Sequence, residues 1–121
     1  MPSPKRKTGD VGEDVAVKYL QQKGFSIVGR NYWKPWGEID IIAKYGSKYR
    51  FIEVKTISRG TIRPEENMHP AKLKKLNRAV QTYLLDHRVG EEEEWQIDLI
   101  CVQLDFDTRR AKVELFENIV F

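Results

Sequence analysis

The amino-acid sequence predicts an α/β domain, with a mixed β-sheet flanked by helices and elements in the order α-β-β-β-α-β-β. Two segments place apolar residues at helical spacing, and one of them lies between strand-like segments, as a crossover helix does between parallel strands. The strand-like segments alternate apolar and polar residues or are apolar throughout, and turn residues separate them. At 121 residues, we expect residues 1–121 to form a single domain.

The two helices are expected over residues 11–23 and from Pro70 to about His87. Asp10 is placed to cap the first helix, and Gly24 follows it as a C-terminal glycine would. Proline favours the first turn of a helix, which places the second start at Pro70. Residues 1–8, which include three consecutive basic residues, are expected to form a flexible basic arm.

Five strands are expected over residues 25–32, 37–44, 49–57, 95–104 and 111–116. Gly46-Ser47 predicts a two-residue hairpin turn between the second and third strands. The fourth strand is apolar on both faces, which indicates a central place in the sheet. Residues 58–69 are polar and rich in turn formers, and predict a long loop.

Composition excludes some classes of protein. Hydrophobic residues make up 40% and charged residues 32%, which is typical of a folded domain. No apolar run is long enough to span a bilayer and no secretory segment follows the basic start, so a cytoplasmic protein without membrane contact is expected. Residues 1–90 hold 18 Lys and Arg against nine Asp and Glu, whereas residues 91–121 hold three against nine. A polyanion-binding face and a merely solvated surface both account for this imbalance.

The predicted hairpin brings acidic residues together. With Gly46-Ser47 as the turn, Asp40 lies opposite Glu53, and Glu38 lies opposite Lys55. Side chains alternate across a strand, so these four share one face of the sheet. Like charges directly opposite each other are destabilising. A positive group is therefore expected between Asp40 and Glu53.

Three positive groups could lie between these two acids: a divalent metal, a shared proton, or Lys55 alone. Oxygen ligands suit Mg²⁺ or Mn²⁺, which are commonly held by one or two carboxylates together with substrate phosphates. That combination favours phosphodiester hydrolysis. Ordinary cross-strand ion pairs on an exposed face are the alternative.

Two residues outside the hairpin fit the same site. Glu13 falls on the face of the first helix that should meet the sheet, although with Asp10 it also resembles a capping box. Lys72 lies at the edge of the apolar stripe of the second helix, where a surface lysine is the ordinary interpretation.

An acid followed by Glu-x-Lys on the next strand resembles the PD-(D/E)xK nuclease superfamily, with Asp40 and Glu53-Val54-Lys55 as its core. The sequence is still more similar to the YraN-type family of predicted endonucleases, which resemble archaeal Holliday-junction resolvases. Ile39 replaces the proline of the superfamily, and Trp95-Gln96-Ile97-Asp98 replaces an Arg-Phe-Asp pattern, so Asp98 is interpreted as structural. The matching stretches are Gly12-Glu13-Asp14 with Ala16 and Leu20, Gly24-Phe25, Arg30-Asn31, Gly37-Glu38-Ile39-Asp40, Phe51-Ile52-Glu53-Val54-Lys55, Lys72 and Asp98.

This resemblance implies a restriction-endonuclease-like fold and a metal-dependent endonuclease acting on DNA, with branched or structured DNA among its substrates. Asp40, Glu53 and the main-chain carbonyl of Val54 would hold Mg²⁺ or Mn²⁺, with Glu13 joining directly or through water. Lys55 would orient or deprotonate the attacking water. Glu38 is expected to support the site from outside or to pair with Lys55.

Phosphate contacts are expected from four basic residues, and a homodimer by analogy with the resolvases. The sequence does not distinguish DNA from RNA. A non-catalytic nucleic-acid-binding module of the same fold is the main alternative, and a structural partner in a larger assembly is a second. The four phosphate-binding candidates are Arg30, Arg59, Arg63 and Lys72.

Overall fold

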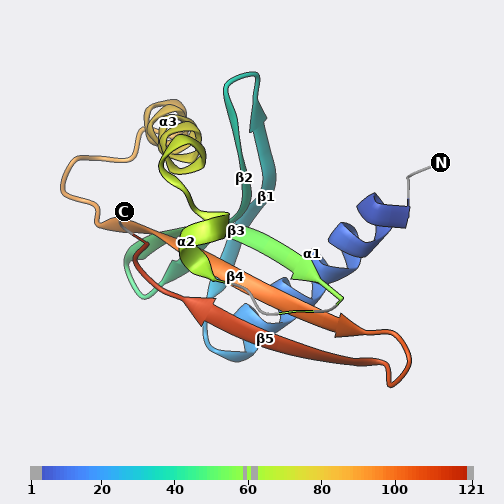
Figure 1. The fold of residues 1–121 in the computed structure, drawn as a ribbon. Helices are drawn as coiled ribbons and strands as arrows, with labels where there is room; N and C mark the ends of the chain where they lie inside the picture. The colour runs from blue at the N-terminus through green and yellow to red at the C-terminus, as the bar shows by residue number, and fades with distance from the viewer. Residues whose placement is uncertain (1–3, 59, 61–62, 120–121) are drawn as a thin grey trace.

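The chain folds into a five-stranded mixed β-sheet with helices on both faces, as a computed structural model shows (Figure 1). The structure describes residues 4–58, 60 and 63–119. No helix within these residues has the length and apolar composition needed to cross a bilayer. The elements are α1 (Pro4–Gln22), β1 (Ser26–Lys34), β2 (Gly37–Tyr45), β3 (Lys48–Ile57), α2 (Pro64–Asn67), α3 (Pro70–Asp86), β4 (Trp95–Asp105) and β5 (Arg110–Phe116).

The strands lie in the order β1-β2-β3-β4-β5. β3 and β4 are parallel, and α3 is the crossover between them, whereas the other neighbours are antiparallel. Tyr45 pairs with Lys48, and Gly46 has a φ of 62°, so the predicted two-residue turn is confirmed. β4 is buried from Gln96 to Val102, as its apolar sequence predicted.

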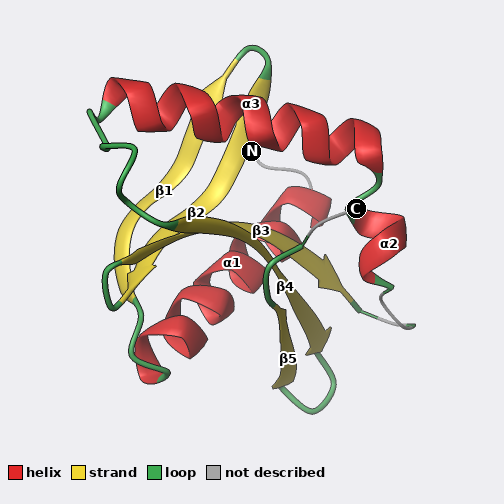
Figure 2. Cartoon of the chain, turned by 90° about the vertical axis from the view of Figure 1, so that its left-hand side faces the viewer, coloured by secondary structure: helices red, strands yellow, loops and turns green. Residues whose placement is uncertain are grey.

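Two apolar layers hold the sheet between the helices. α3 crosses one face over β1 and β2, while α1 lies on the other face (Figure 2). Ile41 and Ile52 pack towards α1. Ile39 packs instead into the α3 layer, although its sequence parity matches that of Ile41, which indicates that β2 turns away from the sheet between these residues.

The first helix begins earlier than the sequence predicted. α1 starts at Pro4, so Asp10 lies inside it and does not cap it, and the predicted capping box with Glu13 is wrong. Residues 4–8, which were expected in a flexible arm, are helical, and residues 1–3 lie outside the described residues. The helix ends as predicted, because Gly24 has a φ of 96° and the Phe25 N–H bonds the Leu20 carbonyl at 2.9 Å.

The expected loop over residues 58–69 contains the short helix α2. Pro64 occupies its first turn, and the Met68 N–H donates to the Pro64 carbonyl at 2.8 Å. Met68 is fully buried in the α3 layer. Two apolar residues, Ile62 and Met68, in a polar stretch of twelve are too weak a pattern to predict this turn of helix.

Candidate functional site

The candidate site lies where β2 and β3 separate. Their ladder runs from the turn only as far as Ile41 and Ile52. Beyond this pair β2 stays with β1 as far as Gly37, and β3 stays with β4 as far as Ile57, so the two strands diverge (Figure 2). We call this divergence, between residues 37–40 and 53–57, the strand fork. The predicted register is confirmed up to the fork, but the ladder ends before the predicted opposed pairs of acids and lysine.

Asp40 takes the place of a ladder partner inside the fork. In a continued ladder Val54 would pair with Ile39, but its N–H donates instead to Asp40 Oδ2 at 2.8 Å. The N–H and C=O of a strand residue point to the same side, so the Val54 carbonyl faces the fork as well. A carboxylate and a main-chain oxygen are thus presented to one space.

The carboxyl of Asp40 is unusually basic. Burial and the negative charge of Glu53 raise its pKa to about 8, although the Val54 N–H acts in the opposite direction. Smaller contributions from Glu38 and Glu13 also raise this pKa. The four acids therefore influence one another electrostatically, and Asp40 is the one that most needs a proton or a cation.

Glu53 is neutralised by a lysine from α3. Lys72 Nζ lies 2.9 Å from Glu53 Oε1, and the Glu53 side chain is only 16% exposed. Lys72 lies in the first turn of α3, where its N–H is directed at the ring of the N-cap His69. The structure therefore brings Lys72 into the site, as a counter-ion to Glu53.

Glu13 reaches the same region from the opposite face. It is buried, and its Oε1 accepts a hydrogen bond from Arg30 Nε at 2.9 Å, while Arg30 Nη2 contacts Asp14 at 2.8 Å. α1 can approach β3 here because Gly12 has no side chain. A Cβ at this position would overlap the Thr56 side chain. Arg30, predicted to bind phosphates, is thus engaged by two acids of α1.

Lys55 and Glu38 occupy the outer part of the fork. Lys55 is exposed, and in the described part of the chain no carboxylate oxygen lies within 4.0 Å of its Nζ. The predicted Glu38–Lys55 ion pair is therefore not formed. Partial burial, Glu53 and Glu13 raise the pKa of Glu38. Glu38 thus adds to the negative potential of the fork.

The donor set suits a hard divalent cation. Asp40, Glu53 and the Val54 carbonyl offer oxygen only, which Mg²⁺ and Mn²⁺ prefer. The raised pKa of Asp40 is the mark of a carboxyl that lacks a compensating positive charge. Among the residues the structure describes, no cluster of three or more His, Cys, Asp or Glu is arranged to hold a metal. The candidate metal site consists of two carboxylates and a carbonyl, with Glu13 held aside by Arg30.

Two further phosphate-binding candidates and two tryptophans near the β1–β2 turn complete the description of the site region. Arg63 precedes α2 with a largely exposed side chain, 3.9 Å from Glu66, and Arg59 lies outside the described residues. Trp33 is exposed on β1. Trp36 is partly buried, and its indole N–H donates to Thr82 of α3 at 3.1 Å, so it anchors the β1–β2 turn to that helix.

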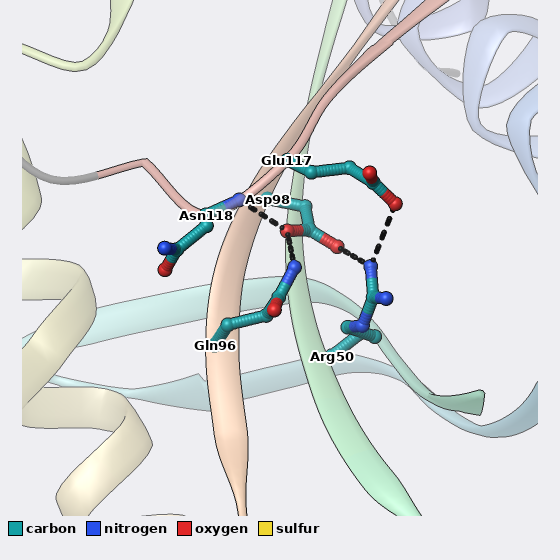
Figure 3. A network of polar contacts seen from close by, with 5 residues as sticks. All are labelled: Arg50, Gln96, Asp98, Glu117 and Asn118. Atoms are coloured by element: carbon teal, nitrogen blue, oxygen red, sulfur yellow. Dashed lines mark hydrogen bonds and ion pairs between the residues drawn. The ribbon is translucent and has the colours of Figure 1, made fainter. Parts of the chain in front are cut away.

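A buried polar network lies at the other end of β3, and the sequence analysis identified only one member (Figure 3). Asp98 is fully buried and accepts hydrogen bonds from Arg50 at 2.9 Å, Gln96 at 2.7 Å and the Asn118 N–H at 2.8 Å. Arg50 also contacts Glu117 at 3.1 Å. Asp98 is thus structural, as predicted. Arg50 had a detectable signal, because it falls on the same strand face as the apolar Ile52.

The sequence was compared with those of known proteins. It matches the uncharacterised protein family UPF0102 over residues 12–102. A UPF0102 protein of Alkaliphilus oremlandii is 37% identical over 114 residues, covering 93% of this chain and 97% of the relative. A UPF0102 protein of Campylobacter jejuni is 38% identical over 113 residues, covering 93% of each chain. One of Chloroflexus aurantiacus is 37% identical over 102 residues, covering 84% of this chain and 83% of the relative. The chain therefore belongs to the UPF0102 family.

Proposed function

We propose that this protein is a metal-dependent endonuclease of the PD-(D/E)xK type that hydrolyses phosphodiester bonds in DNA. The observation that carries the proposal is the half-buried Asp40 beside Glu53 at the strand fork, with its pKa raised to about 8. A stable fold has little reason to keep two such acids together unless a cation joins them. The Glu-x-Lys spacing of Glu53 and Lys55 adds the third group that such hydrolysis uses.

Each residue of the fork has a distinct task in this proposal. Asp40, Glu53 and the Val54 carbonyl would hold Mg²⁺ or Mn²⁺, which when bound polarises a phosphate oxygen and makes its own water more acidic. The Val54 N–H fixes the Asp40 carboxylate. Lys55, exposed beside the fork, would donate a hydrogen bond to the attacking water. That water would form the new P–O bond as the bridging P–O bond breaks; its proton would pass to solvent or to a neighbouring base, and the leaving sugar oxygen would take up a proton from solvent.

The test is cleavage of linear, single-stranded, flapped and four-way-junction DNA, with RNA counterparts, in Mg²⁺ or Mn²⁺. We expect wild type to cut at least one substrate, and Asp40→Ala and Lys55→Ala to lose about 100-fold in rate or more. Lys48→Ala is the matched control, because Lys48 lies on the same strand at the turn end. The proposal fails if wild type cuts nothing, or if both fork variants cut as well as wild type.

A non-catalytic nucleic-acid-binding module is the second candidate. It is favoured by one contact, because Lys72 already supplies Glu53 with a positive charge 2.9 Å away. Titration calorimetry with Mn²⁺ separates the two functions. A nuclease binds Mn²⁺ in wild type and not in Asp40→Ala, whereas the module binds none in either protein. Light scattering on the same samples tests the homodimer expected from the resolvase analogy.

A further inference from the structure

One flank of α3 carries a row of positive side chains that starts at the candidate site. Lys72, Lys75 and Arg78 are three residues apart, and residues at this spacing are neighbours on a helix surface. They span about 9 Å along the helix axis. Lys72 contacts Glu53, so the row begins at the strand fork. We call these three residues the cation row.

The cation row follows the contact between α3 and the turn that joins β1 to β2. A Cβ at Gly37, the first residue of β2, would overlap the Lys75 carbonyl, so the turn lies directly against the helix backbone there. Farther along, the Arg78 guanidinium lies 5.0 Å from the centre of the Trp36 ring. The row therefore runs beside the strand arm that also carries Asp40.

Arg78 is held in place and yet exposed. Trp36, on which it lies, is fixed by the hydrogen bond from its indole N–H to Thr82. Stacking on an aromatic ring leaves the edge of a guanidinium available for hydrogen bonds, and its planar fork matches the oxygens of a phosphate. Less side-chain entropy is lost when a group held in this way binds a ligand.

The rest of the helix makes the row selective for a polyanion. From residue 71 to residue 85, all of them described, α3 contains four cations and no acid. The fourth, Lys74, lies nearly opposite Lys72 around the helix and one turn before Arg78, and it lines a hollow with Leu73, Asn77 and Trp95. Lys74 and Lys75 are both exposed, so the chain offers two adjacent lysines on different flanks.

We propose that the cation row binds consecutive phosphates of a nucleic-acid strand and leads that strand to the fork. This inference rests on the proposed function and assigns its substrate contacts to α3. It extends the sequence prediction from Lys72 to Lys75 and Arg78, and it leaves out Arg30, which is engaged by both Glu13 and Asp14. A regular row beside an acid pair favours a nucleic acid over a lipid surface, since a strand presents its phosphates in line.

The test measures binding of fluorescein-labelled single-stranded and duplex oligonucleotides by fluorescence anisotropy in EDTA, where cleavage does not interfere. Lys75→Gln and Arg78→Gln should each reduce the slope of log K against log salt by about 1. Between 50 and 200 mM salt, wild type should therefore lose about tenfold more affinity than the double variant. Lys74→Gln should retain the wild-type slope. The affinity of Arg78→Lys should fall between the affinities of wild type and Arg78→Gln.

Four outcomes would overturn the proposal. The double variant could bind with the wild-type affinity and slope, or Lys74→Gln could lose as much as Lys75→Gln, which would indicate a general charge effect. Binding to phosphatidylserine vesicles but not to oligonucleotides would assign the row to membranes. Cleavage is measured separately, so an enzyme that cuts normally without the row refutes this inference alone. Row-dependent binding without any cleavage refutes only the proposed function.

Discussion

Asp40 is subject to opposing effects within a few ångströms. Burial and Glu53 disfavour its negative charge, while the N–H of Val54 stabilises it. Burial and Glu53 prevail, so the native protein without a bound cation holds a proton on Asp40 at neutral pH. The same carboxyl in an unfolded chain has a pKa near 4 and is ionised at that pH. Folding therefore takes up a proton at this residue.

The first prediction concerns the pH dependence of stability. Because the native pKa is raised, the native state binds more protons between about pH 4 and pH 8, and the free energy of unfolding falls over this range as pH rises. Asp40→Asn removes the titrating carboxyl, and with it this fall in the free energy of unfolding. The asparagine oxygen remains an acceptor for the Val54 N–H. We expect the variant to be more stable than wild type at pH 9, by on the order of 1–3 kcal/mol, and similar at pH 4.

Urea unfolding at both pH values measures this difference. Asp86→Asn is the control, because Tyr32 and Lys34 lower the pKa of Asp86 and its replacement should not stabilise the protein at pH 9. If the stability of Asp40→Asn relative to wild type is the same at pH 4 and at pH 9, the raised pKa of Asp40 is refuted.

The buried ion pair at Asp98 gives a second prediction at this scale. Asp98→Ala leaves Arg50 buried without its carboxylate, and breaking such a pair costs about 3–5 kcal/mol in the free energy of unfolding. Glu117→Ala, which removes the 56% exposed partner of the same guanidinium, should cost less than about 1 kcal/mol. Chemical denaturation measures both. Equal losses in the two variants would show that the network does not depend on burial.

At the scale of elements, two close approaches position the fork. Gly37 allows β2 to lie against α3, and Gly12 allows α1 to lie against β3. Glu13 follows Gly12 and is thereby carried to the acids of the sheet. Both glycines lie in the matching stretches of the YraN-type resemblance, and the structure supplies a steric reason for them.

The third prediction tests the helix approach. Gly12→Ala places a methyl group on the Thr56 side chain, and overpacking of this kind costs about 1–3 kcal/mol in the free energy of unfolding. Gly9→Ala, on the same helix with open space around it, should be neutral or stabilising by up to about 1 kcal/mol. Thermal unfolding followed by circular dichroism compares the two. If both alanines stabilise the protein equally, α1 does not pack against β3 as closely at Gly12 as described.

α3 contributes a tethered cation to the site, which gives the fourth prediction. A metal ion at Glu53 must compete with Lys72, so Lys72→Met should bind Mn²⁺ more tightly, by about fivefold for a contact worth about 1 kcal/mol. Lys74→Met, on the other flank, should bind as wild type does. Titration calorimetry gives the dissociation constants. Weaker binding by Lys72→Met would mean that the lysine supports the metal site.

At the scale of the whole molecule, local patterns predicted the elements well. Gly24 and Gly46 have the positive φ angles expected of a helix end and a hairpin turn, and the crossover helix gives the predicted parallel pair. The hairpin register then identified Asp40 and Glu53 as neighbours. These features depend on short-range geometry, which residue type and spacing determine.

The strand fork was not predictable in the same way. Whether β2 stays with β3 or leaves it depends on competition between a ladder bond and the Asp40 carboxylate for the Val54 N–H. The pairing of Lys72 with Glu53 and of Arg30 with Glu13 depends on how the helices lie across the sheet. Spacing along one element carries no information about such contacts between distant elements.

The fifth prediction follows from the fork as the meeting point of both helical layers and the sheet. A metal that binds only the native state raises the free energy of unfolding of the whole domain, by about 2.7 kcal/mol at 100 times its dissociation constant. Mn²⁺ and protons compete for Asp40, so this stabilisation should grow as pH rises towards 8. The melting temperature should therefore increase by several degrees in Mn²⁺ at pH 8 and by much less at pH 5.

Differential scanning fluorimetry across this pH range measures the effect. Asp40→Asn should show no pH-dependent stabilisation by Mn²⁺, whereas Glu117→Gln, in the Asp98 network away from the fork, should respond as wild type does. If Asp40→Asn gains as much as wild type, Mn²⁺ binds outside the fork. A wild-type melting temperature that does not change with Mn²⁺ at any pH would leave the proton on Asp40, Lys72 beside Glu53 and Arg30 beside Glu13 as the positive charges that balance these acids.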